Sequence, residues 1–404
     1  MDVKMQKHVS LLNVVRTTTS TSYTNTSDRE PIWFYDADAF DNVIAIYLEA
    51  DLRPGNAADT MYAILSDLTP SDVSGSGVSA TGSTAQARVR SGDIKGNLVD
   101  GTNYRARWKC DNGAGGAPAD TGAVDAIRII IVQQGAVTKT ETVIEIAEDN
   151  NVPSTSYTAP EDYAIFLFTA SRFNGTLNVF LEADLKPTSA AQVTYAQLYD
   201  ITAGAAVSGS EVSHTGDTTL TRKRSAAITL VDGHQYRADI KATATTDDIG
   251  GVKIIIQQTG TPTSTECYIP ILNSMSSGSG SAYAYQNRLL DYSASEWDGD
   301  SETDEYEATL KVSVGAETGT YNLYNDTDAT ELAAATTTAT AYTRDRDTSV
   351  TLPSDDTNTL NSGRKTSVGV ETVTVARSFL IKTMTWSASA AAVTPLRMLM
   401  GMGT

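Results

Sequence analysis

The chain of 404 residues is poor in the side chains that most enzymes use, with two cysteines and three histidines. Thiol and imidazole groups supply many nucleophiles, general bases and metal ligands, so this scarcity disfavours such sites. Basic residues are also scarce, since 30 Lys and Arg stand against 49 Asp and Glu, for a net charge of −19. Phosphate contacts need clustered Lys and Arg, so nucleic-acid binding and attachment to anionic membranes are disfavoured. The composition favours a non-enzymatic binding or structural protein.

Long hydrophobic runs are absent as well. The longest apolar stretch, residues 126–132, is interrupted by Arg128 and is far shorter than the ~20 residues of a transmembrane helix. The apolar stretch at residues 9–15 contains two polar residues, whereas a secretory signal needs about 7–15 continuous apolar ones. We therefore expect a chain made in the cytoplasm and not exported by the general route, unless a leader has been removed. Cys110 and Cys267 permit a structural disulfide without implying one.

Internal repetition is the strongest signal that the sequence contains. The block YLEADLRP at residues 47–54 recurs as FLEADLKP at residues 180–187, and a more diverged copy has YEATLK at residues 306–311. Five further blocks recur in the same order in the first two copies: 62–67 with 195–200, 74–79 with 208–213, 88–91 with 222–225, 98–106 with 230–238 and 129–134 with 254–258. The copies also open alike, with TSYT at 21–24 and at 155–158 and SAY at 281–283.

Each copy has the residue pattern of β-strands. Residues 43–50 and 177–183 alternate apolar with polar or small side chains, and no window has a sustained apolar stripe of helical period. The Asp-Gly pairs at 100–101 and 232–233 stand between apolar runs, as hairpin turns do. About eight strands in about 120 residues predict an antiparallel β-sandwich. The simplest form is a jelly roll, and an immunoglobulin-like sandwich is the alternative.

The repeats divide the chain into three tandem β-sandwich domains and a tail. The aligned segments 140–146 and 265–271 predict a short strand at the start of the second and third copies, and residues 9–15 could take this part in the first. The predicted divisions are residues 1–139, 140–263, 264–387 and 388–404.

The strand-like tail invites two interpretations, because chain ends are usually disordered unless something holds them. It could fold back on the third domain, or it could add to a sheet edge or groove of a neighbouring subunit by strand complementation. In the second case the subunit interface would use its apolar residues, which are Val393, Leu396, Met398, Leu399 and Met400.

The densest carboxylate cluster has acidic residues at alternate positions, namely Asp298, Asp300, Glu302 and Asp304. Alternate carboxylates can direct several oxygens at Ca²⁺, as the first half of an EF-hand loop does. Thr303 and Thr309 stand where that loop needs Gly and Glu, so a solvated acidic loop is the alternative. Calcium is the one cofactor candidate, and we find no catalytic constellation.

Three further sets of residues are candidate sites. The Arg pairs recur in all three copies, and residues two apart lie on one strand face, where they could form ion pairs within a domain or between subunits. His214 and His234 fall in predicted loops, so we expect them to be exposed. Tryptophans could form a sugar-binding face or pack in cores. The Arg pairs are Arg88 and Arg90, Arg222 and Arg224, Arg344 and Arg346, and the tryptophans are Trp33, Trp108, Trp297 and Trp386.

The repeated framework, from TSYT through LEADL and R-x-R-S to DG-x-x-YRA, resembles β-sandwich modules in virion-associated proteins of tailed phages. The resemblance covers most of residues 19–386 and rests on framework positions. It implies a structural decoration, fibre or tail component, made in the host cytoplasm and located in the virion. Its partners would be copies of itself and other particle proteins, with no nucleic acid and no membrane. The alternatives are a subunit of an extracellular filament or surface layer joined by strand complementation, and a carbohydrate-binding adhesin at the cell surface.

Overall fold

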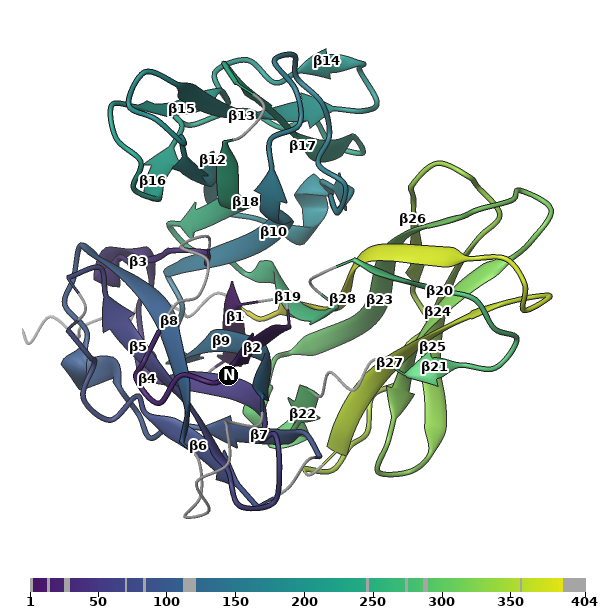
Figure 1. The fold of residues 1–404 in the computed structure, drawn as a ribbon, viewed down its shortest axis with the longest axis horizontal. Coiled ribbons are helices and arrows are strands. Elements are labelled where there is room, and N and C mark those ends of the chain that lie inside the picture. Colours follow the sequence, from purple (N-terminus) through teal and green to yellow (C-terminus); the bar gives the residue numbers. More distant parts are fainter. Residues whose placement is uncertain are drawn as a thin grey trace, which may run out of the picture.

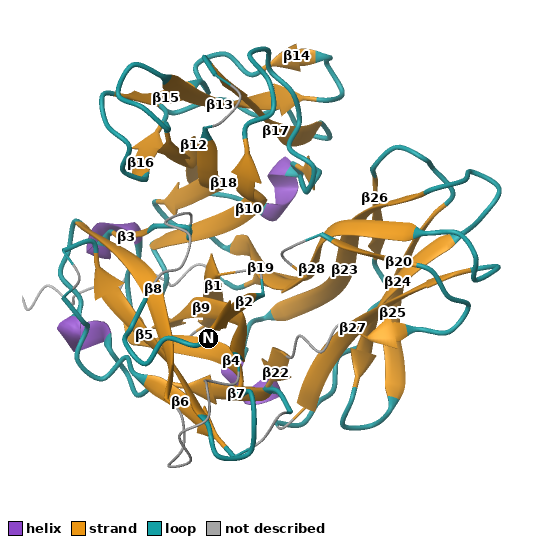
Figure 2. Cartoon of the chain, in the orientation of Figure 1, coloured by secondary structure: helices purple, strands orange, loops and turns teal. Residues whose placement is uncertain are grey.

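The computed structural model is all-β, with six antiparallel sheets and four short 3₁₀ helices among the residues that it describes (Figure 2). Those residues are 3–12, 15–24, 30–69, 71–82, 85–111, 121–244, 247–272, 275–285, 290–356 and 358–387. Within these ranges no helix has the length and apolar character that crossing a membrane requires.

Each copy contributes two sheets. In the first copy one sheet has the order β1 (Val3–Leu12), β9 (Gly122–Gly135), β4 (Val43–Arg53), β7 (Ala87–Arg90), with β2 (Arg16–Thr18) beside β9. The other has the order β3 (Trp33–Tyr35), β8 (Thr102–Asp111), β5 (Thr60–Asp67), β6 (Val78–Thr81).

The second and third copies repeat this plan. In the second copy one sheet has the order β10 (Lys139–Asn151), β18 (Asp248–Thr259), β12 (Thr176–Lys186), β16 (Thr221–Arg224). The other has the order β11 (Phe166–Leu167), β17 (Gln235–Ala242), β13 (Val193–Asp200), β14 (Ala205–Ala206), with β15 (Val212–Thr215) beside β13. In the third copy one sheet has the order β19 (Ser264–Leu272), β28 (Val373–Thr385), β23 (Ser301–Val312), β26 (Thr343–Asp347), with β20 (Ser276–Gly278) beside β28. The other has the order β21 (Ala284–Tyr285), β27 (Asn358–Thr366), β24 (Gly319–Asn325), β25 (Thr330–Thr337), with β22 (Leu290–Tyr292) beside β27.

The strand order distinguishes the two predicted kinds of sandwich. In the first copy β1 pairs with β9, β3 with β8, β4 with β7 and β5 with β6, and the other copies have the same nested pairs. Such nesting results when one long antiparallel ribbon folds over on itself, which is the jelly roll. The predicted all-β jelly roll is therefore confirmed, and the immunoglobulin-like alternative is wrong.

Burial patterns show how the two sheets of a copy differ. Strands β5 and β13 alternate buried and partly exposed residues, so one face of their sheets lies on the core and the other faces outward. Strands β9 and β18 are buried along nearly their whole length. Their sheets are therefore covered on both faces, on one side by their own sandwich and on the other by neighbouring copies.

The three sandwiches surround a common centre, where the first strands β1, β10 and β19 meet (Figure 1). The hydrophobic clusters cross from copy to copy at this centre. Val3 and Met5 of β1 belong to the cluster of the third copy, while Tyr268 and Phe379 of the third copy belong to that of the second. The three copies therefore pack against one another and are not independent domains joined by linkers.

The two Asp-Gly pairs form turns, but the predicted hairpins are wrong. Asp100 and Gly101 follow the 3₁₀ helix η2 (Lys95–Asn97) and lead into β8, whereas the preceding strand β7 lies in the other sheet. An Asp-Gly pair favours a turn with positive φ, here +73° at Gly101, without determining which strands pair. The carboxylates of Asp100 and Asp232 instead accept hydrogen bonds from Ala37 of the 3₁₀ helix η1 (Ala37–Ala39) and from Ala170 of η3 (Ala170–Arg172). In the third copy Asp356, which is not part of an Asp-Gly pair, accepts one from Ser295 of η4 (Ala294–Glu296).

Gly319 at the start of β24 lies where strands from both sheets of the third copy approach closely. A Cβ at this position would lie 2.7 Å from Val312 Cγ1 and from Val373 Cγ2. We expect Gly319→Ala to lower the free energy of unfolding by about 1–3 kcal/mol, measured by urea denaturation. Gly92→Ala is the control, because its Cβ would meet no atom within 4 Å. Equal effects of the two substitutions would contradict this packing.

Candidate functional site at the centre of three jelly rolls

The centre of the molecule is built around a buried lysine. Lys7 of β1 donates hydrogen bonds from Nζ to Thr142 Oγ1 at 2.7 Å, Thr265 Oγ1 at 2.9 Å and the Glu266 carbonyl at 2.9 Å. These acceptors belong to β10 and β19, so one side chain binds the first strands of both other copies. Counted from the β-bulge that each first strand contains, Lys7, Thr142 and Cys267 occupy equivalent positions. Burial lowers the pKa of Lys7 and raises the pKa of Cys267.

The acidic residue of each YLEADL-like block binds the Arg pair of its own copy. Glu49 contacts Arg88 and Arg90, and its counterparts Glu182 and Glu307 make the same pairs with Arg222 and Arg224, and with Arg344 and Arg346. The predicted ion pairs within a domain are confirmed. They are buried rather than exposed, because the three carboxylates are at most 3% accessible. Burial opposes ionisation of Glu182, but the hydrogen bond from Arg222 and the charges around it hold its pKa below the usual value.

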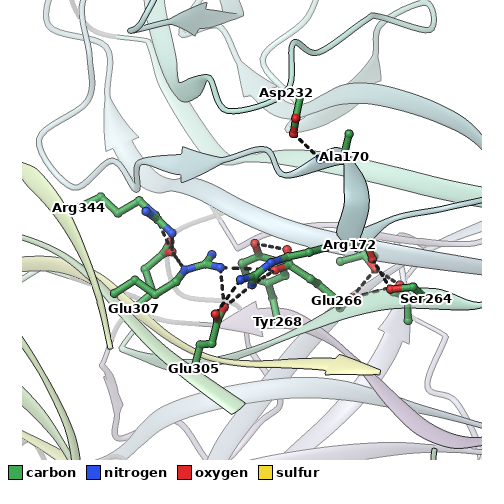
Figure 3. Close-up of polar contacts among 12 residues, drawn as sticks. Ala170, Arg172, Asp232, Ser264, Glu266, Tyr268, Glu305, Glu307 and Arg344 are labelled. Atoms are coloured by element: carbon green, nitrogen blue, oxygen red, sulfur yellow. Dashed lines mark hydrogen bonds and ion pairs between the residues drawn. The ribbon is translucent and has the colours of Figure 1, made fainter. Parts of the chain in front are cut away.

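The contact between the second and third copies, junction 2–3, contains an extended polar network (Figure 3). Arg172 at the end of η3 binds Glu305 of β23 with both terminal nitrogens, and one of them also lies 2.7 Å from Glu266 Oε1. Arg346 joins the same network through Glu305, at 2.7 Å. A helix end of one copy is thereby held by two carboxylates of the next.

Arg377 of β28 makes a second charged contact at junction 2–3. Its side chain is completely buried and lies 3.8 Å from Glu145, 3.5 Å from Glu148 and 3.4 Å from Asp162, all in the second copy. Its Nε also donates to the Asp162 carbonyl at 3.3 Å. The guanidinium therefore compensates three carboxylates that the interface removes from water.

Junction 1–2, between the first and second copies, uses a buried lysine in a related way. The Ile32 N–H donates to Asp184 Oδ2 at 2.9 Å, and Lys253 Nζ donates to the Ile32 carbonyl at 2.7 Å. Lys253 also pairs with Asp184 at 3.3 Å. Arg222 lies 4.2 Å from the centre of the Phe34 ring across the same junction.

Junction 3–1 joins the third copy back to the first. Glu296, at the end of η4, lies 2.8 Å from Arg90 and also accepts from Gln6 of β1. Lys4 and Asp298 exchange two backbone hydrogen bonds, at 2.7 and 2.8 Å. The equivalent residue of the first copy, Asp41, makes a backbone hydrogen bond of 3.2 Å with Lys139 at the start of β10. The same kind of contact that joins consecutive copies therefore closes the ring.

The ion pairs of junction 2–3 predict a dependence on pH. Burial alone would raise the pKa of Glu305, but the hydrogen bond from Arg172 and the charge of Arg346 hold it below the usual 4.5. A carboxyl whose pKa is lower in the folded state stabilises it above about pH 4.5, and that stabilisation is lost as the pH falls through the folded-state pKa. We expect Glu305→Gln to lower the free energy of unfolding at pH 7 by about 2 kcal/mol.

In urea titrations at several pH values, the difference in free energy of unfolding between Glu305→Gln and the unchanged protein should disappear as the solution is acidified. Asp38→Asn is the matched control, because Asp38 is exposed, and it should cost little at any pH. A deficit that is the same at pH 3 and pH 7 would show that ionisation of Glu305 is not its cause.

The carboxylates of the candidate calcium site face different partners. Asp300 accepts hydrogen bonds from the backbone and hydroxyl of Ser387, whereas Glu302 and Asp304 both pair with Lys382, at 3.1 and 2.7 Å. Asp298 belongs to junction 3–1 through its backbone. Across the described ranges no group of three or more His, Cys, Asp or Glu side chains is placed to hold a metal ion. The structure therefore does not bring these four residues together.

The remaining candidates fall in several places. Cys110 and Cys267 are both buried. The prediction of an exposed His214 is wrong, because it lies in β15 with 5% of its surface accessible, and His234 is partly buried and lies 2.7 Å from Asp200. Trp33, Trp108, Trp297 and Trp386 are buried in cores. The proposed interface residues Val393, Leu396, Met398, Leu399 and Met400 lie outside the described residues.

Some residues that join the copies were missed by comparing repeats, because they differ at equivalent positions. Ala39, Arg172 and Glu296 all end a 3₁₀ helix, yet one is neutral, one positive and one negative. Each copy meets a different neighbour, so these contact residues need not be shared by all copies. A search for changes of charge at equivalent positions could have found them.

Known proteins give only distant matches to this chain. No family model matches the chain, and no curated protein matches it. The chain is similar to a triple jelly-roll protein from an archaeal virus turret, with 9% identity over 96% of this chain and 91% of that one and a TM-score of 0.20. A protein of infectious bursal disease virus matches with 10% identity over 95% and 80% and a TM-score of 0.16. A tandem CBM22 domain of Paenibacillus barcinonensis Xyn10C matches with 10% identity over 62% and 93% and a TM-score of 0.16.

Proposed function

We propose that this chain is a non-enzymatic structural subunit of a larger particle, namely a decoration, fibre or tail component of a phage virion. The observation that carries the proposal is the closed arrangement of three jelly rolls around β1, β10 and β19. Buried ion pairs or a buried lysine hold junctions 1–2 and 2–3, and Glu296 and Asp298 hold junction 3–1. Such pairs specify which faces meet, so they suit a building block of fixed shape.

The tail exchange that was considered from the sequence is constrained by this arrangement. Each first-strand position is already occupied within the chain, by β1, β10 and β19. A tail that resembles these strands would need a jelly roll that lacks its own first strand, or another groove. In the simpler form of the proposal, the chain therefore assembles through other surfaces than a vacant first-strand position. Its partners are copies of this chain and other particle proteins.

The proposal is tested on particles and on the purified chain. Mass spectrometry of purified virions from cells that express the chain should detect it in a fixed ratio to the main capsid protein. The purified full chain should form oligomers by light scattering and negative-stain microscopy, and a chain ending at Ser387 shows whether the tail is needed. Absence from purified particles, together with a monomeric full chain, would contradict the structural role.

Carbohydrate binding is a second candidate because the third copy presents aromatic rings together on one outer sheet. Tyr283, Tyr285 and Tyr324 have neighbouring ring centres 6.1 and 4.8 Å apart, and Tyr285 is 37% exposed. Asn322 and Glu331 are hydrogen-bonded to each other on the same sheet, at 2.9 Å. An array of glycans should reveal a ligand whose binding is lost in Tyr285→Ala and kept in Tyr195→Ala, a control that removes a tyrosine from a sheet of the second copy. No glycan bound by the full chain would exclude this function.

A further inference from the structure

Junction 1–2 contains a cavity of about 350 Å³ that is open to solvent. The first copy lines it with Glu30, Ile32, Leu68 and Arg105, and the second copy with Lys186 and the segment 218–220. A volume in this range is typical of pockets for small ligands. Two cationic side chains, apolar walls and one carboxylate thus meet at a boundary between copies.

The position that corresponds to this cavity at junction 2–3 is given by equivalent residues of the repeats. Ile32 and Ile165 each donate a backbone hydrogen bond to the next copy, to Asp184 and to Thr309. Arg105 and Arg237 both come from the DG-x-x-YRA blocks, and Lys186 and Lys311 both end the LEADLK-like blocks. The two junctions therefore offer one arginine and one lysine each, from opposite copies.

Two tyrosine rings fill this place at junction 2–3. Tyr163 and Tyr342 meet edge to face with ring centres 5.3 Å apart. The Arg237 guanidinium lies 5.6 Å from the centre of the Tyr163 ring, and Lys311 Nζ lies 4.4 Å from that of Tyr342. Aromatic faces attract cations, so the two rings occupy the space between the two positive charges.

Junction 1–2 lacks both rings. The position of Tyr163, two residues before Ile165, is taken by Glu30, two residues before Ile32. The position of Tyr342, two residues before the Arg pair of the third copy, is taken by Leu220, two residues before the Arg pair of the second. Glu30 pairs with Arg16 at 3.8 Å. The cavity is thus the space that aromatic rings fill at the related junction.

We propose that this cavity binds an aromatic ring carrying a hydroxyl group, held between Arg105 and Lys186. The ring would lie against the apolar side chains of Ile32, Leu68 and Leu220, and its hydroxyl could donate to Glu30. The source is a free phenolic compound or a tyrosine side chain of a partner chain. This inference does not depend on the proposed virion function.

The test uses the full chain, with p-cresol and an acetylated, amidated Gly-Tyr-Gly peptide as probes and 4-methylcyclohexanol as the non-aromatic control. Titration followed by NMR should show p-cresol binding at millimolar concentration or tighter, at least about tenfold more tightly than the control, because the cyclohexane ring lacks the face that attracts cations. Peptide binding would indicate a partner's tyrosine, and binding of p-cresol alone would indicate a small molecule. If p-cresol does not bind, or binds no better than the control, the proposal is overturned.

Two sets of variants locate the binding. The double substitution Glu30→Tyr with Leu220→Tyr should fill the cavity, abolish p-cresol binding and leave the protein folded with an equal or higher Tm. Arg105→Gln and Lys186→Gln should each weaken binding about tenfold, and they keep the test open if the double variant does not fold. Arg53→Gln, the counterpart of Lys186 in the first copy, is the control and should leave binding unchanged. Unchanged affinity in the double variant or in both single variants would overturn the proposal.

Discussion

Arg377→Met is expected to lower the free energy of unfolding by about 3–5 kcal/mol, because it removes one partner of a buried ionic network. Methionine fills a similar volume, so the loss reports charge rather than a cavity. Without the guanidinium, Glu145, Glu148 and Asp162 would remain close together and shielded from water. Carboxylates placed in this way repel each other and lose hydration.

Guanidinium denaturation followed by tryptophan fluorescence measures this effect, since Trp297 and Trp386 report on the third copy. Unfolding of three copies can have several phases, so the phase that these tryptophans report is the one to compare. Arg53→Met is the matched control, because its side chain is 46% exposed and pairs with Asp125 at 3.2 Å, and it should cost about 0–1 kcal/mol. If Arg377→Met lowers the free energy of unfolding no more than Arg53→Met does, Arg377 does not stabilise junction 2–3 as described.

A chain without residues 1–12 is expected to lose the closed arrangement of the copies. The deletion removes β1, and with it Val9, Leu11 and Leu12 from the core of the first copy and Val3 and Met5 from that of the third. At about 2 kcal/mol for each buried apolar side chain, the loss approaches 10 kcal/mol, which is comparable to the whole stability of a domain. It also removes Lys7, whose contacts bind β10 and β19.

Hydrogen exchange tests this expectation, with β9 and β19 as the strands that should lose protection. A synthetic peptide of residues 1–15 added in trans should restore protection, because it supplies the missing strand, and a scrambled peptide should not. Full protection of both strands in the truncated chain would contradict the central role of β1.

The repeated blocks allowed the strands and the sandwich class to be predicted, but not the strand order. Alternation of apolar residues shows that a strand has a buried face, and the same alternation suits a jelly roll and an immunoglobulin-like sandwich. The order depends on pairs far apart in sequence, such as Val9 of β1 with Ile129 of β9. The Asp-Gly turns were misassigned for the same reason, since a dipeptide cannot show that Asp100 will bind Ala37.

The site was less accessible to sequence reasoning than the fold. The Arg pairs and their glutamates repeat in all copies, so their ion pairs could be anticipated, although not their burial. The tyrosines of the TSYT-like segments were recognised as repeated, but the sequence did not indicate their contacts. Tyr23, Tyr157 and Tyr283 each lie beside a lysine of the adjacent outer sheet, at 5.3, 4.2 and 4.0 Å from ring centre to Nζ. Long-range geometry gives these residues their roles.

The contact between Lys4 and Asp298 has a consequence for how the three-lobed shape responds to dilution. Three separate jelly rolls arranged in this way would form a trimer that dissociates at low concentration. In this chain the covalent links and junctions 1–2 and 2–3 keep the two faces of junction 3–1 near each other, at an effective concentration that reaches the millimolar range for tethered partners. Even a modest contact is then formed almost all of the time. The protein can therefore present a threefold-like shape as a single molecule, independent of how many copies are present.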